Sequence, residues 1–363
     1  MITPTASVST AAKKIRVMVV DDSAVIRAVI ARTLNATPDI EVVGVAKNGQ
    51  EGVDLIKKLQ PDIVVLDIEM PIMDGITALP LLLKEKPDAR ILICSTLSAH
   101  GAEISIKALS LGATECILKP GGDAILSAEQ FQENLVGVIR TLGSHALKKP
   151  VVTGHAATIA AQGSFTLRSS GVQSLPPTIL AIGSSTGGPK ALMEVLKNMN
   201  DLPVPIVVTQ HMPKTFTTLL AQHINQNCKI PASEGAEGMV IKKGHVYIAP
   251  GGYHMVLKKR GEDVVISINE DAPENFCRPS VNPMLRSLIP IYGGRILTVI
   301  LTGMGNDGSQ VCKDVVEKGG QVIAQDEATS VVWGMPGAVA TAGLCTAVLP
   351  LQEINGWIKK AIK

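Results

Sequence analysis

The chain has 363 residues, a formal net charge of +2 and only 2% aromatic residues. Its length favours two domains over one. The small charge gives no basic surface for nucleic acid, and few aromatic rings are present for bases to stack on. Because residues 1–10 are polar and no run approaches the roughly 20 apolar residues of a membrane span, we expect a cytoplasmic protein without membrane insertion.

The first part of the chain alternates short apolar strands with helices. Strands are predicted at IRVMVV, IEVVGVA, DIVVL, RILIC and ECIL. Helices are predicted over residues 24–34, 50–58, 76–84, 102–110 and 127–142. This alternation is typical of a doubly wound parallel sheet, because crossovers between parallel strands are right-handed. We predict a flavodoxin-like (βα)5 domain over residues 14–142.

A second domain is predicted after a linker. Residues 143–176 are rich in Ser, Gly, Thr, Ala and Pro, a composition typical of a flexible linker. Strands then resume at TILAI, PIVVTQ, HVYIAP, ILTVIL, QVIA and TAVLP, and MVLKKRGEDVVISI indicates an antiparallel hairpin around Gly261. We predict a doubly wound α/β domain with a mostly parallel sheet over residues 177–363.

Charged side chains follow the strands of the first domain. Asp21 and Asp22 come directly after the first strand, Asp67 after the third, and Lys119 after the fifth. These strand ends share one edge of a parallel sheet, and strands one and three are neighbours in the flavodoxin-like order. The clustered carboxylates would repel one another, which favours a bound divalent cation with oxygen ligands, such as Mg²⁺.

This pocket has the composition of a phosphoryl-transfer site. Asp67 would attack a phosphoryl donor in line, while the cation and Lys119 neutralise charge on the transferring oxygens. Ser95 and Thr96 follow the fourth strand, where a hydroxyl can reach the phosphoryl group. Any one of the acids alone would be explained as a helix N-cap. Their placement at matching strand ends favours phosphorylation of Asp67.

These segments resemble the response-regulator receiver family. VVDDS, VVLDIEMPIMDG and the Lys119-Pro120 pair are the motifs concerned, and the resemblance covers about residues 14–140. It implies that Asp67 is the phosphorylated residue, that the backbone carbonyl of Glu69 also binds the metal, and that a histidine kinase is the phosphodonor.

The run TILAIGSSTGGPKAL places a glycine-rich loop between a strand and a helix. Such a loop can be a dinucleotide loop, a phosphate loop or a turn that exposes a nucleophilic serine. Ser185 stands where a dinucleotide loop needs its second glycine, and no G-x-x-x-x-G-K-[ST] follows. Gly183 to Gly187 does satisfy G-x-S-x-G, with Ser185 at the centre, although so short a pattern recurs by chance.

A nucleophilic serine needs a base and a third group that orients the base. His211 directly follows PIVVTQ, and Asp307 lies in LTGMGNDG after ILTVIL, so both occupy the sheet edge that presents Ser185. Among the other histidines only His254, in APGGYH, competes as the base, and it could equally line the cleft. Asp307 between glycines is also a common turn residue.

The order serine, histidine, aspartate differs from that of the α/β-hydrolases and of two protease families, which predicts a separate fold. Several segments resemble the protein-glutamate methylesterase domain over roughly residues 177–360: AIGSSTGGPKAL, VTQHMPKTFT, YIAPGGYH, RPSVNPML, LTGMGNDG and QDEATSVVWGMPGAV. Together with the receiver, the whole chain resembles the chemotaxis response-regulator methylesterases.

That resemblance implies hydrolysis of glutamate methyl esters on chemoreceptors, often with deamidation of glutamines, and no cofactor for the esterase reaction. The implied catalytic triad comprises Ser185, His211 and Asp307. The implied oxyanion hole uses the backbone N–H of Met304 together with Thr186. Ser184 stands where the family commonly has alanine, so two adjacent serines compete, and the centre of the motif favours Ser185.

The sequence disfavours two other classes of protein. A receiver with a DNA-binding output would need a short helix-turn-helix and a basic face, whereas the second half is long and weakly charged. An oxidoreductase that binds a nucleotide at the loop beginning with Gly183 would bind nicotinamide, which we do not expect.

Overall fold

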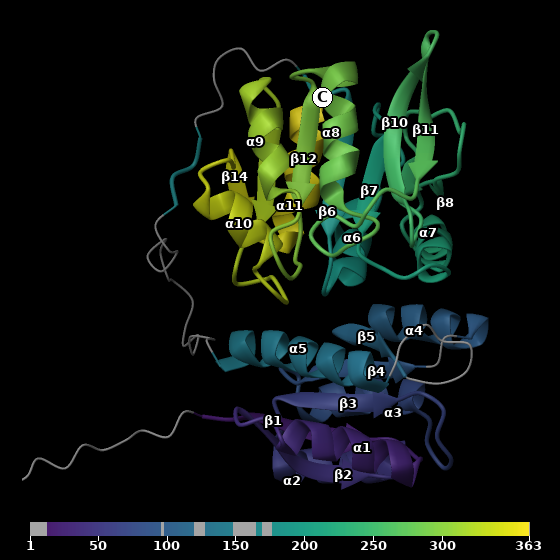
Figure 1. Ribbon diagram of the computed structural model, residues 1–363, viewed down its shortest axis with the longest axis vertical. Helices are drawn as coiled ribbons and strands as arrows, with labels where there is room; N and C mark the ends of the chain where they lie inside the picture. The colour runs from purple at the N-terminus through teal and green to yellow at the C-terminus, as the bar shows by residue number, and fades with distance from the viewer. Residues whose placement is uncertain (1–12, 96–97, 120–127, 148–164, 169–175, 363) are drawn as a thin grey trace, which may run out of the picture. The chain divides into compact units, whose positions relative to one another are not determined.

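The computed structural model describes residues 13–95, 98–119, 128–147, 165–168 and 176–362. The chain divides into two compact units, each built on its own sheet (Figure 1). Among the described helices, none has the length and apolar character needed to cross a membrane.

The first unit is built on a sheet of order β2-β1-β3-β4-β5. Its strands are β1 (Ile15–Val20), β2 (Ile40–Ala46), β3 (Ile63–Asp67), β4 (Arg90–Ser95) and β5 (Glu115–Leu118). The helices that alternate with these strands along the chain are α1 (Ala24–Asn35), α2 (Gly49–Leu59), α3 (Gly75–Glu85), α4 (Ala99–Leu111) and α5 (Ala128–Leu147). Of these, α4 is grouped with the second compact unit. The β1–β2, β1–β3 and β3–β4 pairs are parallel, which confirms the predicted flavodoxin-like class.

Local sequence determines where these elements begin. Ser23, Asn48 and Asp74 each accept a hydrogen bond from the backbone N–H three residues on, and so cap the starts of α1, α2 and α3. The central strand β3 is buried along its whole length, as expected for a continuous apolar run covered on both faces. Its last residue, Asp67, therefore reaches the sheet edge from within the core.

The second unit has a sheet of order β14-β13-β12-β6-β7-β9-β8 and a separate hairpin, β10–β11. The strands are β6 (Ile179–Ser184), β7 (Ile206–Gln210), β8 (Ala232–Glu234), β9 (Val246–Ile248), β10 (His254–Arg260), β11 (Asp263–Asn269), β12 (Ile296–Ile300), β13 (Gln321–Gln325) and β14 (Ala347–Leu349). The helices are α6 (Gly188–Leu196), α7 (Phe216–Asn227), α8 (Val281–Tyr292), α9 (Ser309–Glu317), α10 (Met335–Thr341) and α11 (Leu351–Ile362).

The pairing of these strands confirms the predicted α/β class. Every described pair in the seven-stranded sheet is parallel, while β10 and β11 pair antiparallel around the predicted turn at Gly261. Since β6 lies between β12 and β7, the loops that follow these three strands meet at one edge of the sheet. Ser185, Asp307 and His211 lie in those three loops.

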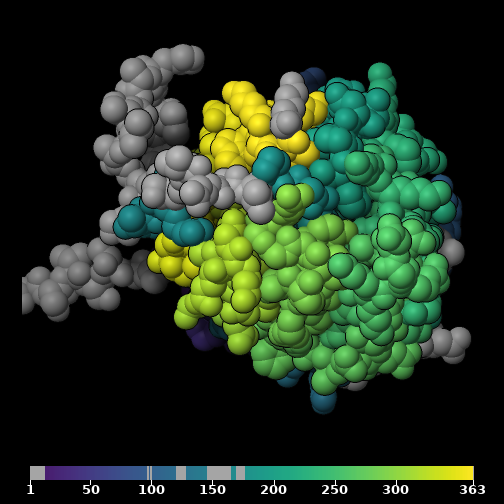
Figure 2. Space-filling view, turned by 90° about the horizontal axis from the view of Figure 1, so that it is seen from above, coloured from purple at the N-terminus to yellow at the C-terminus, as the bar shows by residue number. Residues whose placement is uncertain are grey.

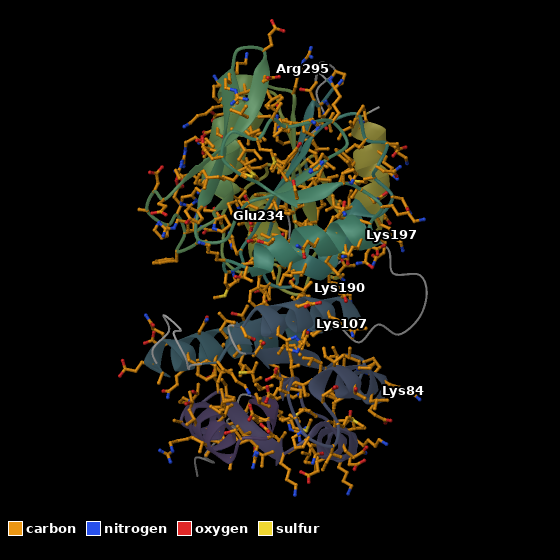
Figure 3. All side chains as sticks on the ribbon, turned by 90° about the vertical axis from the view of Figure 1, so that its right-hand side faces the viewer. Lys84, Lys107, Lys190, Lys197, Glu234 and Arg295 are labelled. Carbon is orange, nitrogen blue, oxygen red and sulfur yellow. The ribbon has the colours of Figure 1, made fainter. Side chains whose placement is uncertain are left out.

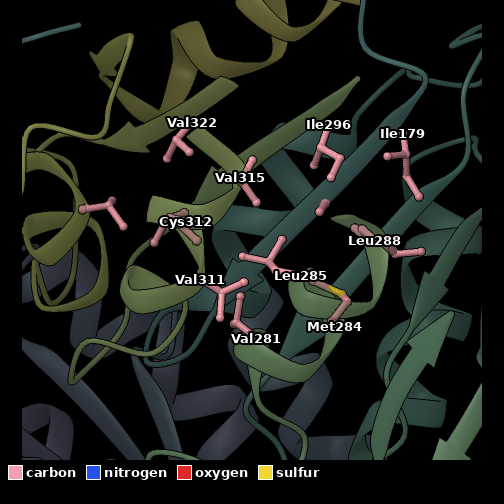
Figure 4. Close-up of a cluster of buried hydrophobic side chains, with 14 of the residues drawn as sticks. Ile179, Val281, Met284, Leu285, Leu288, Ile296, Val311, Cys312, Val315 and Val322 are labelled. Atoms are coloured by element: carbon pink, nitrogen blue, oxygen red, sulfur yellow. The ribbon is translucent and has the colours of Figure 1, made fainter. Parts of the chain in front are cut away.

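A buried cluster between the sheet and helices α8 and α9 supports this edge (Figure 4). Side chains of α8 and α9 meet those of the strands there: Val281, Met284, Leu285, Leu288, Val311, Cys312, Val315, Ile179, Ile296 and Val322. A Cβ at Gly183 would lie 2.8 Å from Val281 Cγ2, so the end of β6 approaches the start of α8 closely. Helix α8 also packs beside β10 of the hairpin. In Figure 2 the green atoms, which the bar assigns to about residues 230–290, lie together on one side of the view.

The predicted linker differs in part from the structure. Residues 143–147 continue α5, and residues 165–168 pack on the second unit. Arg168 N–H donates to Cys345 O at 2.9 Å, and the ring of Phe165 lies 6.2 Å from that of Trp333. The rest of the predicted linker lies outside the described residues, and the domain boundaries remain a prediction.

Candidate active sites

The first unit gathers its predicted charged residues at the end of the sheet. Asp21, Asp22 and Asp67 offer carboxylate oxygens that lie within 4.8 Å of one another. Lys119 Nζ lies 2.8 Å from Asp21 Oδ2 and 2.8 Å from Asp67 Oδ1. The predicted convergence of these four side chains is therefore present.

The electrostatics of this pocket suit a cation. Burial raises the pKa of Asp67, and the charge of Asp21 adds to that effect, while Lys119 opposes it. Burial lowers the pKa of Lys119, but the two carboxylates outweigh burial and raise it. Three carboxylates face one ammonium, so negative charge is in excess, and the donors are the hard oxygens that Mg²⁺ prefers. The residues fit Mg²⁺.

The other residues predicted for this pocket are placed less completely. Ser95 is buried at the end of β4, where its carbonyl oxygen accepts a hydrogen bond from Lys119 N–H at 2.7 Å. Glu69 has an exposed side chain two residues after Asp67. Thr96 lies outside the described residues. Metal binding by the Glu69 carbonyl and phosphoryl sensing by Ser95 and Thr96 remain predictions.

In the second unit, Ser185 lies in a tight turn between β6 and α6. Its N–H donates to Thr302 O at 3.0 Å, in the loop after β12. Its carbonyl oxygen accepts from Gly188 N–H at 2.7 Å and from Gln210 Nε2 at 2.9 Å, at the end of β7. The turn is thus fixed to both neighbouring strands.

The glycines around Ser185 allow close approach of other groups. Gly187 has a φ of +76°, which suits a residue without Cβ. A Cβ at residue 188 would lie 1.9 Å from Gln210 Oε1, and one at Gly303 would lie 2.8 Å from Ser185 Cβ. Positive φ falls on Gly187 and not on Ser185, so this turn differs from the strained nucleophile elbow of the α/β-hydrolases.

Burial distinguishes the two adjacent serines. Ser184 is fully buried, and its hydroxyl donates to Gln210 Oε1 at 2.6 Å. Gln210 in turn holds the carbonyl oxygen of Ser185, whose own side chain is partly exposed. This geometry assigns Ser184 a structural part and supports Ser185 as the nucleophile.

His211 begins the loop after β7 and pairs with Asp307. Its backbone N–H donates to Ser184 O at 3.1 Å, and its Nε2 lies 2.8 Å from Asp307 Oδ2. The loop after β9 approaches this loop closely at Gly251, because a Cβ there would lie only 2.3 Å from Lys214 N. Gly251, in the loop after β9, also donates its N–H to Thr217 Oγ1 of α7 at 2.9 Å.

Thr217 and its neighbour Thr218 are fixed in turn by the next strand. Their hydroxyls donate to the two carboxylate oxygens of Glu234 on β8, which is labelled in Figure 3. The start of α7, the helix that follows the His211 loop, is therefore connected to the edge of the sheet through buried and half-buried polar groups.

Asp307 lies in the loop after β12, where it contacts the N-terminus of α8 and accepts hydrogen bonds from several groups. Val281 N–H donates at 2.6 Å, Ser280 Oγ at 2.8 Å and Asn275 Nδ2 at 2.9 Å. Burial raises the pKa of Asp307, but the bonds from His211, Val281 and Ser280 outweigh burial and lower it. The residue is therefore a carboxylate, stabilised further by the positive end of the helix dipole.

The second ring nitrogen of His211 faces a cysteine. Cys277 Sγ lies 3.4 Å from Nδ1. Burial lowers the pKa of His211, but Asp307 and Cys277 outweigh it and raise the value to about 9. Since the carboxylate engages Nε2, the neutral ring has its proton on Nε2, and Nδ1 is the nitrogen able to accept a proton. The described residues include no hydrogen bond between Ser185 Oγ and His211, and such bonds often form only with substrate bound.

His254, the competing histidine, has both ring nitrogens occupied. Its Nδ1 accepts from Ser280 N–H at 3.2 Å, and its Nε2 lies 3.1 Å from Ala272 O. It is buried and supports the segment that leads into α8. These contacts with backbone groups favour His211 over His254 as the base.

The predicted oxyanion residues lie on either side of the Ser185 turn. Thr186 follows Ser185, and its carbonyl oxygen accepts from Thr302 Oγ1 at 2.9 Å. Met304 lies in the loop after β12, with its side chain 50% exposed. Their use as oxyanion donors remains a prediction.

Sequence reasoning missed Gln210, Asn275, Cys277 and Ser280. Ser280 lies in RPSVNPML, one of the segments that resemble the methylesterase domain, so the sequence did mark the region around this residue. The contacts of Asn275 and Cys277 join positions 32 and 66 residues apart, and no local pattern indicates them.

A receiver-type phosphorylation pocket and a serine-histidine-aspartate site thus occupy one chain, which defines a phosphorylation-regulated class of serine hydrolase. Residues 180–358 match the CheB methylesterase family, and residues 17–129 match the response regulator receiver domain. The chain belongs to the family of response-regulator protein-glutamate methylesterases. It is a carboxylic ester hydrolase, which rules out the DNA-binding and oxidoreductase alternatives.

Two relatives match almost the whole chain. A protein-glutamate methylesterase/protein-glutamine glutaminase of group 2 operon from Rhodospirillum centenum is 49% identical, over 95% of this chain and 93% of its own. A protein-glutamate methylesterase/protein-glutamine glutaminase from Azospirillum brasilense is 47% identical, over 95% and 92%. The crystal structure of the Thermotoga maritima CheB methylesterase catalytic domain is 39% identical, with a TM-score of 0.49, over 51% of this chain and 99% of its own.

Proposed function

We propose that this enzyme hydrolyses γ-methyl esters of glutamate on chemoreceptors, deamidates receptor glutamines, and so serves chemotactic adaptation in the cytoplasm. The observation that supports this most is the placement of Ser185 beside the buried His211–Asp307 pair, in a chain that also has the Asp67 pocket. A histidine kinase of the chemotaxis pathway would phosphorylate Asp67.

In the proposed reaction, Ser185 Oγ attacks the ester carbonyl as its proton passes to His211 Nδ1. The Ser185 oxygen forms a bond to the carbonyl carbon, and the backbone N–H groups of Thr186 and Met304 hold the resulting oxyanion. The C–O bond to the leaving group then breaks, and the His211 imidazolium gives its proton to the methoxide oxygen, which departs as methanol. Water, deprotonated by His211, next attacks the acyl enzyme. The acyl C–O bond to Ser185 breaks, His211 returns the proton to Ser185 Oγ, and the glutamate carboxylate leaves.

Asp307 stabilises the imidazolium in both steps through Nε2. A glutamine follows the same course with ammonia as the leaving group. Loss of one oxyanion donor should reduce the rate about 100- to 1,000-fold.

Phosphorylation of Asp67 is proposed to raise esterase activity. When bound by Asp21, Asp22, Asp67 and the Glu69 carbonyl, Mg²⁺ would neutralise charge on the phosphoryl oxygens. We infer that the esterase step itself needs no metal, because the imidazole of His211, paired with the Asp307 carboxylate, can take the proton of Ser185.

The proposed substrate is tested with receptor-bearing membranes that carry isotopically labelled methyl esters. The enzyme is expected to release labelled methanol from them, and ammonia from receptors with glutamine at the same positions. Membranes from cells without receptors, methylated in the same way, serve as the control. Equal methanol release from both preparations would contradict a receptor substrate.

A further inference from the structure

A short turn beside the catalytic pair has an unusual conformation. Residues 274–277, here called the 274–277 turn, are closed by a hydrogen bond from Cys277 N–H to Glu274 O at 2.9 Å. The two central residues, Asn275 and Phe276, have φ values of +52° and +62°. Positive φ at both positions is the pattern of a type I′ turn, which strongly favours Asn-Gly. A phenylalanine in the second position is therefore strained.

The active site holds this turn in place. Asn275 Nδ2 donates to Asp307 Oδ1 at 2.9 Å, and Cys277 Sγ lies 3.4 Å from His211 Nδ1. Glu274 accepts two hydrogen bonds from Arg286 of α8, at 2.8 and 3.0 Å. The tip of the turn is consequently at a fixed position relative to both His211 and Asp307.

The side chain at this tip is fully exposed. Phe276 has a relative exposure of 103%, whereas Phe131 and Phe216 are 2% exposed and Phe165 packs against the second unit's core. Folding therefore gains nothing from the ring of Phe276, although its backbone is strained. Strain of this kind is concentrated at functional sites.

Two exposed apolar side chains of residues 176–362 belong to segments that reach Asp307. Within residues 176–362 the large hydrophobic side chains that are exposed are Phe276 and Met304. Phe276 is adjacent to Asn275, which bonds Asp307, and Met304 precedes Asp307 by three residues. Glu274 and Arg286 pair with each other, so the turn adds no net charge to this surface.

We propose that Phe276, with Met304, contacts an apolar side chain of the substrate protein next to the modified glutamate. The inference rests on the proposed function, in that the ester is part of a protein. A glutamate side chain is short, so the substrate backbone must come close to His211 when the ester carbonyl reaches Ser185. A side chain near that glutamate then meets the rigid tip at Phe276 and is removed from water against it.

The test compares Phe276→Ala, Phe276→Gly and Phe276→Leu in the full chain, with labelled receptor membranes as the substrate. Phe276→Ala should raise KM about tenfold and leave kcat within about twofold, because only a binding contact is lost. Phe276→Leu, which keeps an apolar side chain, should stay within about threefold of the wild-type KM. Leu167→Ala removes an exposed apolar side chain outside the catalytic loops and should leave KM unchanged.

Phe276→Gly separates binding from stability. It creates the Asn-Gly pair that the turn favours, so Tm should stay at or above the wild-type value while KM rises as in Phe276→Ala. If Phe276 served only the fold, its variants would lose activity only together with a fall in Tm.

Three results would overturn the proposal. One is an unchanged KM in both Phe276→Ala and Phe276→Gly. Another is a fall in kcat at constant KM, which would mean that the turn only positions His211. The third is a self-association of the wild type that Phe276→Ala abolishes, which would assign the surface to a second copy. Wild-type enzyme that released no methanol would instead refute the proposed substrate, and this contact with it.

Discussion

Replacing Ser185 with alanine is expected to reduce methanol release by about four orders of magnitude or more, as for other triad nucleophiles. The variant loses the oxygen that forms the acyl bond, and no neighbouring group can replace it. Ser184 Oγ is buried and donates to Gln210 Oε1, so it is not available for attack on an ester. Methanol release from labelled receptor membranes, measured for Ser185→Ala and for Ser184→Ala, checks the assignment.

Ser184→Ala is the matched control, because it removes the same atom one residue earlier. It leaves Gln210 Oε1 without its donor and should lower the free energy of unfolding by about 1–2 kcal/mol. Gln210 Nε2 still holds Ser185 O, so most of the activity should remain. A dead Ser184→Ala variant beside an active Ser185→Ala variant would reverse the assignment.

Asp307→Asn is expected to lower kcat by about 10⁴-fold, by analogy with the same change in other triads. The amide cannot accept every bond that the carboxylate accepts from His211, Ser280 and Val281. The imidazole then loses both its fixed tautomer and the charge that stabilises its protonated form. Asn275→Ala removes only one hydrogen bond to Asp307 and should lower kcat by at most about tenfold.

The pH dependence of kcat/KM provides a second measurement on Asp307→Asn. His211 has a pKa of about 9 and must be neutral at Nδ1 to act as a base, so wild-type kcat/KM should rise with pH up to about 9. Asp307→Asn removes a group that raises this pKa, and Cys277→Ala removes another, so both should move the rise to lower pH. Profiles that coincide with the wild type would contradict the pairing.

The free energy of unfolding should also depend on pH through the pKa of His211. The folded-state pKa of His211 lies at about 9 against an ordinary value of 6.5. The imidazolium therefore stabilises the fold fully below pH 6.5, and this contribution is lost as pH rises through 9. The difference in free energy of unfolding between wild type and Asp307→Asn should shrink over that interval.

The sequence predicted both sheets and both catalytic edges, because buried parallel strands appear as short apolar runs and functional residues follow them directly. Asp21, Asp67 and Lys119 could be placed together for that reason alone. The end of α5 was predicted too early, since Ser144 and neighbouring polar residues continue the helix through Leu147.

The competition between the two serines could not be resolved from sequence. Ser184 and Ser185 are adjacent, and only the buried bond to Gln210 distinguishes them. Likewise, nothing in APGGYH indicates that the nitrogens of His254 are taken by the backbone of a distant segment. Contacts of this kind depend on how loops from separate strands meet.

The most direct test of the account measures methanol release by the full chain from labelled receptor membranes, with and without acetyl phosphate and Mg²⁺. We predict that acetyl phosphate raises the rate about tenfold or more, which requires only about 1.4 kcal/mol of coupling between Asp67 and the esterase site. Chelation of Mg²⁺, or Asp67→Ala, should remove this increase and spare the basal rate. An equal increase in the wild type and Asp67→Ala, or a basal rate that disappears with chelation, would contradict the account.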